Sequence, residues 1–247
     1  MVLIISSLNK LRFLNIFVTR HITGTTAMHC LLIAATAFEI APFIKSYRQQ
    51  VASKQTVTTD ILITGVGLVA CTYSIMKYLS ARRPSIIIQA GIAGSFDRNL
   101  PLGTVVAVKQ ERIADLGVKE KDKWNTIFDL DLARPGRPPY SKGWLVNKSP
   151  VLKKISLLEV SGISVNEITT SPQRIKTYQQ QFQPVTESLE GAGLHHVALS
   201  ENIPFLQLRS LSNYVGEREK KKWRLAESIH NLNLELIKTI NMLNTGS

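Results

Sequence analysis

Short apolar segments that alternate with helical patterns constrain the fold of this chain more than any other feature. The strand-like segments are almost continuously apolar, which is typical of strands buried on both faces. The predicted strands are residues 30–36, 60–66, 85–89 and 203–211, and the clearest predicted helices are residues 68–79 and 226–243. This alternation predicts an α/β fold, a single-domain three-layer α/β/α arrangement around a central mixed, mostly parallel twisted sheet.

The remaining segments complete this prediction. Residues 38–44 have helical spacing of apolar positions after the first strand, and residues 102–109 form a β-rich stretch after a proline. Residues 124–147 hold several prolines and aromatics, which predicts a long ordered loop that shapes a pocket or a subunit contact. With 247 residues, of which 44% are hydrophobic, the chain is long enough to bury one sizeable core.

The charge of the chain limits its partners. Thirty Lys and Arg against eighteen Asp and Glu give a formal net charge of +12, which favours anionic partners. Basic clusters occur in residues 119–123 and 218–224, but acidic residues interrupt both and neither has the aromatic spacing of a single-strand binding platform. We predict that each is a solvated helix face, and we expect no nucleic-acid partner.

The first 27 residues differ in composition from the rest. They contain no acidic residue and three basic ones, but no secretory-signal core and no run of about 20 apolar residues that could span a membrane. A transit-like segment is one explanation, and a disordered extension or a misassigned start codon is the favoured one. We therefore expect the domain to begin at Met28. Cys30 and Cys71 lie in apolar runs and are predicted to be reduced and buried, as in a cytoplasmic protein without a membrane segment.

Candidate functional residues follow the predicted strands, where ligands of parallel α/β sheets usually bind. Residues 90–94, Ala-Gly-Ile-Ala-Gly, predict a glycine turn whose bare backbone N–H groups can approach a ligand. Glu39 follows the first strand, and Glu190 stands at the predicted start of a helix. Arg209 and Asn213 bracket the end of a buried strand. Each residue alone also fits a structural role, because glutamate is favoured at helix N-termini, arginine usually faces water and asparagine often forms turns.

Several longer motifs extend this pattern. They are Ala90-Gly-Ile-Ala-Gly-Ser-Phe, Pro101-Leu-Gly-Thr-Val-Val, Glu187-Ser-Leu-Glu-Gly-Ala-Gly and Arg209-Ser-Leu-Ser-Asn-Tyr. With these motifs the chain resembles the purine nucleoside phosphorylase and nucleosidase superfamily, in particular its methylthioadenosine and adenosylhomocysteine nucleosidase branch. Gly162-Ile-Ser-Val-Asn-Glu-Ile-Thr-Thr and the stretch over residues 205–218 are most similar to the futalosine hydrolases of an alternative menaquinone route. The resemblance covers residues 28–243 and implies one nucleoside phosphorylase-like domain over residues 28–247.

The resemblance implies roles for the candidate residues. Glu39 matches the glutamate that activates water, and Glu190 matches the glutamate that accepts hydrogen bonds from the ribose 2′ and 3′ hydroxyls. These roles suit the cleavage of a glycosidic bond, because a carboxylate near the sugar stabilises the developing oxocarbenium charge and a second one takes a proton from water. Leu189 replaces the methionine that usually lies under the sugar. The other implied substrate-binding residues are Gly91, Ile92, Ala93, Val165 and Asn166.

Two departures from the family pattern bear on the reaction. Ile92 stands where many relatives have a serine that binds phosphate or places water, so hydrolysis is favoured over phosphorolysis, with Arg209 left to orient Glu39 or the water. Asn213 replaces the aspartate that protonates N7 of adenine. An amide cannot act as a general acid, but it can donate to O6 of a 6-oxopurine and accept from a protonated N7, which points to hypoxanthine as the leaving base.

The predicted function is hydrolysis of futalosine to hypoxanthine and dehypoxanthinyl futalosine, without a metal ion or organic cofactor. The partner is then a small purine nucleoside that carries an aromatic carboxylate, and the resemblance implies a homo-oligomer, a dimer or higher. The alternatives are a methylthioadenosine/adenosylhomocysteine-type nucleosidase, a purine nucleoside phosphorylase, a catalytically inactive nucleoside-binding module and a basic nucleic-acid-binding protein. His195 and His196 are expected to pack in the core.

Overall fold

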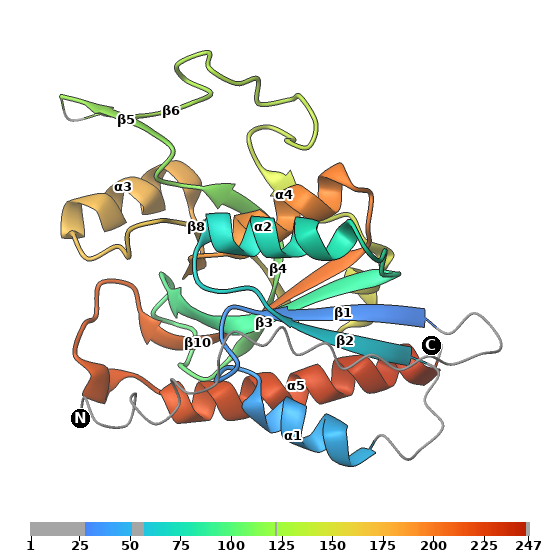
Figure 1. The fold of residues 1–247 in the computed structure, drawn as a ribbon. Helices are drawn as coiled ribbons and strands as arrows, with labels where there is room; N and C mark the ends of the chain where they lie inside the picture. The colour runs from blue at the N-terminus through green and yellow to red at the C-terminus, as the bar shows by residue number, and fades with distance from the viewer. Residues whose placement is uncertain (1–27, 51–56, 122, 246–247) are drawn as a thin grey trace.

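The computed structural model describes residues 28–50, 57–121 and 123–245, which form a single α/β domain (Figure 1). The extension predicted for residues 1–27 lies outside the described residues. The strands are β1 (Met28–Ala34), β2 (Val57–Ile63), β3 (Ile86–Ser95), β4 (Val105–Ile113), β5 (Gly117–Glu120), β6 (Lys123–Thr126), β7 (Leu145–Val146), β8 (Leu158–Ser164), β9 (Thr186–Ser188) and β10 (Phe205–Tyr214). The helices are α1 (Ala41–Gln50), α2 (Leu68–Leu79), α3 (Pro172–Phe182), α4 (Gly191–Ser200) and α5 (Leu225–Thr245), with 3₁₀ turns at Pro150–Lys154 and Lys220–Lys222.

The central sheet is mixed, as the sequence predicted. Within the described residues its strand order is β10-β4-β8-β9-β3-β1-β2, with β7 on the edge of β4. Strand β1 pairs in parallel with β2 on one side and with β3 on the other, and the pairs β3–β10, β4–β8 and β8–β9 are also parallel. The pairs β4–β10, β3–β9 and β4–β7 are antiparallel.

Part of this sheet closes on itself, a feature that the predicted layered arrangement lacks. Strand β10 pairs with β4 on one side and with β3 on the other, so β10, β4, β8, β9 and β3 form a closed ring. The long strand β3 makes this possible, because its first half pairs with β1 and its last two residues pair with β9. Irregularities in β4 and β10, where the pairing register shifts, add the local bend that closure needs.

Helices cover both faces of the sheet around β1. Alternate residues of β1 face opposite sides, as expected for an extended strand. Leu32 packs in one buried cluster with side chains of α1 and α5, and Leu31 packs in another with side chains of α2 and α4. Figure 1 shows α1 and α5 on one side of β1–β3 and α2 and α4 on the other. No described helix has the length and apolar character of a membrane span.

Three local predictions were wrong. Residues 90–94 belong to β3 and form no turn, and β10 continues to Tyr214, so Arg209 and Asn213 lie within the strand. Both segments stay extended because β3 and β10 pair with each other over this length. The basic clusters are exposed but are not helix faces. The described residues of the first cluster, 119–121 and 123, lie at the tip of the β5–β6 hairpin, and residues 218–224 form a loop with one 3₁₀ turn.

Candidate active site

A cavity of about 340 Å³ opens where β1, β3 and β10 end. Its walls come from the segment after β1, the second half of β3, the segment that links β9 to α4, and the end of β10. Four of the residues predicted to have catalytic or sugar-binding roles gather there or directly behind its wall. The cavity lies at the carboxyl ends of parallel strands, the position predicted from the sequence.

Glu39 lies just before α1 and is buried, with 7% of its surface exposed. The backbone N–H and the hydroxyl of Thr36 both donate to its Oε2 at 3.0 Å, and the backbone N–H of Ile92 donates to its Oε1 at 3.1 Å. A carboxylate has about four lone-pair sites, so these three bonds fix its orientation and leave room for one more donor. A water molecule on the cavity side can supply that donor.

Arg209 projects from β10 and is 1% exposed. Its Nη2 donates to Oε1 of Gln89 at 3.1 Å and lies 3.7 Å from Oε2 of Glu190, and its Nη1 donates to the carbonyl oxygen of Ile92 at 3.4 Å. Gly91 makes this placement possible, because a Cβ at that position would collide with the guanidinium and lie 3.0 Å from Oε1 of Glu39. The absence of a side chain at Gly91 therefore lets the guanidinium of Arg209 pack between the carboxylates of Glu39 and Glu190.

Glu190 is the N-cap residue of α4 and is 5% exposed. Its Oε1 accepts a hydrogen bond from the backbone N–H of Gly67 at 3.0 Å, and its Oε2 faces Arg209 beyond hydrogen-bond distance. Gly67 has a φ of 94°, which L side chains rarely adopt, so glycine is required at this turn before α2. The carboxylate retains free lone pairs that can accept from two hydroxyl groups.

Asn213 lines the cavity from the end of β10 and is half-buried. Its Oδ1 accepts from the hydroxyl of Ser212 at 2.9 Å, and its Nδ2 donates to the carbonyl oxygen of Tyr214 at 3.1 Å. These bonds use one of the two N–H groups of the amide and one of the lone pairs on its oxygen, so the group can still donate and accept once each.

The structure brings some of the remaining predicted residues to the cavity and leaves others out. Leu189, Ile92 and Ala93 line it. Val165 does not, because it is fully buried in a cluster with Phe96 and Tyr178. Asn166 does not line the cavity either, since its backbone N–H and its side chain both donate to the carboxylate of Asp115 at the surface.

Other cavity residues were missed by the sequence analysis. Ile168 and Trp223 contribute apolar walls, and Glu187 contributes a third buried carboxylate. Glu187 is the first residue of the motif Glu187-Ser-Leu-Glu-Gly-Ala-Gly, three residues before Glu190. This spacing was the only sequence signal for a role of Glu187. Trp223 lies inside the basic cluster of residues 218–224 and carried no signal of its own.

A buried polar network lies beneath the start of α4. The Glu111 carboxylate accepts from Nε2 of Gln207 at 2.8 Å and from the hydroxyl of Ser164 at 3.1 Å, and a Cβ on Gly191 would collide with it. Burial raises the pKa of Glu111 to about 7. Burial likewise lowers the pKa of His195 to about 4, so its ring is neutral at pH 7. The ring is buried in the core, as predicted, and packs against Phe205.

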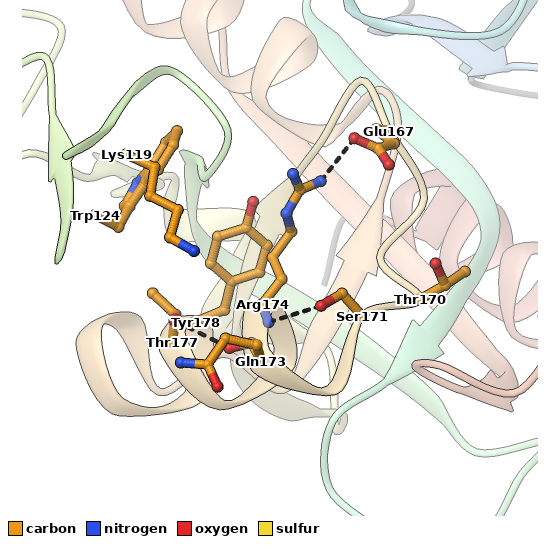
Figure 2. A pocket seen from close by; sticks show the side chains of 9 residues that line it. All are labelled: Lys119, Trp124, Glu167, Thr170, Ser171, Gln173, Arg174, Thr177 and Tyr178. Carbon is orange, nitrogen blue, oxygen red and sulfur yellow. Dashed lines mark hydrogen bonds and ion pairs between the residues drawn. The ribbon is translucent and has the colours of Figure 1, made fainter. Parts of the chain in front are cut away.

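A second cavity of about 210 Å³ lies between the β5–β6 hairpin and α3 (Figure 2). The segment after β8 separates it from the first cavity, because Ile168 lines the first while Glu167 and Thr170 line the second. Figure 2 shows Glu167 paired with Arg174, at 2.8 Å, on the side of the second cavity. Among the described residues, no group of three His, Cys, Asp or Glu side chains could hold a metal ion.

The fold and the cavity together define an α/β protein with a ligand-sized cavity at the carboxyl ends of its parallel strands. No family model matches the chain. A futalosine hydrolase from Streptomyces coelicolor is 26% identical over 182 residues, 69% of this chain and 73% of that protein. A 5′-methylthioadenosine/S-adenosylhomocysteine nucleosidase from Maridesulfovibrio salexigens is 25% identical over 174 residues, 65% of this chain and 70% of that protein.

A solved structure shows the same fold. The 5′-methylthioadenosine/S-adenosyl homocysteine nucleosidase of Helicobacter pylori, complexed with a pyrrolopyrimidine ligand, superposes with a TM-score of 0.72 at 17% identity and covers 88% of this chain and 99% of its own. The family resemblance predicted from the sequence is confirmed: the chain is similar to futalosine hydrolases in sequence and to a nucleosidase in fold. Both named groups are N-glycosyl hydrolases, and that predicted enzyme class is confirmed too.

Proposed function

We propose that the chain hydrolyses the N-glycosidic bond of futalosine and releases hypoxanthine and dehypoxanthinyl futalosine, a step of the futalosine route to menaquinone. The observation that carries this proposal is the convergence of Glu39, Arg209 and Glu190 on one cavity with Asn213 in its wall. The similarity to a futalosine hydrolase supports the choice of substrate.

The proposed mechanism assigns one task to each side chain. Glu190 accepts hydrogen bonds from the ribose hydroxyls, which positions the sugar and stabilises positive charge at its anomeric carbon. Glu39 takes a proton from a water molecule that attacks this carbon. Arg209, packed between the two carboxylates, orients Glu39 or the attacking water.

The base-recognition part of the proposal assigns hypoxanthine to Asn213. The base leaves with the electron pair of the broken C1′–N9 bond and takes up a proton from solvent at N7. The free N–H of the Asn213 amide donates to O6, and its oxygen accepts from the N7–H. Val165 and Asn166 remain in the proposal only as supports of the segment that carries Ile168 into the cavity.

Water is proposed as the acceptor of the sugar because of Ile92. Its apolar side chain lines the cavity, and by the family resemblance it stands where many relatives carry a serine that binds phosphate or places water. The N–H of Ile92 is already used by Glu39. The second candidate function is a methylthioadenosine/adenosylhomocysteine-type nucleosidase, which the Maridesulfovibrio relative supports.

The experiment that separates these candidates is a substrate panel. The purified protein is incubated with futalosine, inosine and methylthioadenosine, each with and without phosphate, and the released base is identified by chromatography. Release of hypoxanthine from futalosine without phosphate supports the proposal, whereas release of adenine alone, or a strict need for phosphate, contradicts it.

We further propose that the protein is a cytoplasmic homo-oligomer. Val69, Tyr73 and Met76 form an exposed apolar stripe on α2, with exposed fractions of 82%, 63% and 42%, and the stripe continues to Val66 at the cavity. A surface of this kind suits a second copy of the chain. Light scattering coupled to size-exclusion chromatography tests it: a monomeric mass at micromolar concentration contradicts the proposal.

A further inference from the structure

Glu187 is a buried carboxylate that has no place in the mechanism above. It is 7% exposed and lines the first cavity. Its Oε1 accepts a hydrogen bond from the backbone N–H of Thr169 at 3.1 Å, but its Oε2 has no hydrogen-bond donor among the described residues. Burial raises the pKa of Glu187. A buried carboxylate oxygen without a donor is costly, so a ligand that supplies one gains affinity.

The sheet register places Glu187 opposite Asn213. Glu187 of β9 pairs with Gly94 of β3, and Gly94 pairs with Asn213 of β10. Directly paired residues of neighbouring strands project to the same face of the sheet. The side chains of Glu187 and Asn213 therefore project to the same face, with Gly94, which has no side chain, between them. Two strand spacings of about 4.8 Å separate their backbones by about 10 Å. All three residues line the cavity.

This gap matches one edge of a purine. A 6-oxopurine presents N7, then O6, then an N1–H donor along that edge, whereas adenine presents N7, an amino group and an N1 acceptor. With Asn213 at N7 and O6, the N1 position falls on the side of Glu187. Of the other described carboxylates, Glu39 and Glu190 line the cavity but are assigned to the water and the sugar, and Glu167 faces the second cavity, where it pairs with Arg174 (Figure 2).

We propose that Glu187 accepts a hydrogen bond from the N1–H of a 6-oxopurine base and thereby selects hypoxanthine over adenine. The terminal torsion of a glutamate is soft, so a small rotation presents Oε2 to the cavity while Oε1 stays near Thr169. A site built around such a bond rejects a base that lacks the donor, because the buried carboxylate is then left unpaired. The inference rests on the proposed function, since it assumes that the cavity holds a purine.

The test is a binding cycle that uses hypoxanthine and 1-methylhypoxanthine, which has a methyl group in place of the N1 hydrogen. Dissociation constants are measured by calorimetry for the wild-type protein, for Glu187→Gln and for Glu167→Gln. We expect the wild-type protein to bind hypoxanthine about 10- to 100-fold more tightly than the methylated base, as for a hydrogen bond to a charged group. In Glu187→Gln this ratio falls to within about threefold, and adenine binding improves relative to hypoxanthine, because a glutamine amide can donate to N1 of adenine.

The matched control Glu167→Gln keeps the wild-type ratio, because that carboxylate lies in the other cavity. If Glu187→Gln keeps the wild-type ratio while its thermal unfolding matches that of the wild-type protein, Glu187 does not contact N1 and the inference is overturned, although the proposed function stands. If the wild-type protein binds neither hypoxanthine nor futalosine, the proposed function fails and the inference fails with it. Glu187→Ala, which removes the carboxylate altogether, repeats the cycle should the glutamine variant not fold, with the same loss of discrimination expected.

Discussion

Replacement of Glu39 by glutamine separates water activation from substrate binding. The carboxylate holds three hydrogen bonds, two from Thr36 and one from Ile92. A glutamine amide that keeps its oxygen toward Thr36 turns its NH₂ group toward the Ile92 N–H, so one donor faces another. One buried hydrogen bond is therefore lost, which costs about 1 to 3 kcal/mol of folding stability. For a domain of this size each kcal/mol lowers Tm by about 2 to 4 °C.

The effect on turnover is expected to be much larger than the effect on stability. A general base contributes about 10²- to 10⁴-fold to the rate, so Glu39→Gln should lower kcat by about this factor. Binding of hypoxanthine should change little, because the proposal places the base at Asn213, which lines the cavity from the end of β10. Hypoxanthine release from futalosine measures the rate, calorimetry measures product binding, and a thermal melt checks the fold. A folded variant with kcat within threefold of wild type refutes the assignment of Glu39 as the base.

Three further changes test other parts of the account. Glu190→Gln should lower kcat/KM for futalosine by about 100-fold or more, because hydrogen bonds to the sugar that are stronger in the transition state are weakened. The thermal melt should still show a folded protein. An unchanged kcat/KM would mean that Glu190 does not contact the sugar. Asn213→Asp places a carboxylate opposite O6, so that two acceptors face each other. The preference for futalosine over its 6-amino counterpart, measured as the ratio of their kcat/KM values across pH, should shrink by about tenfold. Asp60→Asn should destabilise the fold by about 1 to 3 kcal/mol in urea titrations, because buried Asp60 accepts from His29, Tyr78 and Arg82. Burial opposes ionisation of Asp60, but these partners hold its pKa below the usual value. The stability advantage of the wild-type protein over Asp60→Asn should therefore be present above about pH 4 and vanish as the pH falls through the lowered pKa. A stability difference that stays constant down to about pH 2 contradicts this.

Local patterns were enough to predict the first half of the sheet and the helices with regular apolar spacing. Residues 68–79 were predicted as a helix and form α2, and the apolar runs at residues 30–36 and 60–66 overlap β1 and β2. The closed ring could not be predicted in this way, because it depends on β3 pairing with both β9 and β10. The pairing of β3 with these strands cannot be recognised from the local sequence, because residues 90–94 of β3, Ala-Gly-Ile-Ala-Gly, have the composition of a turn.

The candidate site was predictable where residue type and position in a motif agree. Glu39, Glu190 and Arg209 were singled out, and the structure brings them together. Glu187 was missed because its importance depends on the register that places it beside Gly94, which is a long-range property of the sheet. Val165 and Asn166 were expected at the substrate on the family resemblance alone, but after Ser164 the chain directs them to the core and to Asp115.

The central claim is that this cavity transfers the sugar of futalosine from hypoxanthine to water. The most direct measurement is a reaction with futalosine in ¹⁸O-labelled water that also contains phosphate, followed by mass spectrometry of both products. The account predicts unlabelled hypoxanthine and a dehypoxanthinylated sugar that carries one ¹⁸O atom, at a rate independent of phosphate. A sugar phosphate as product, or futalosine left intact while methylthioadenosine yields adenine, contradicts it.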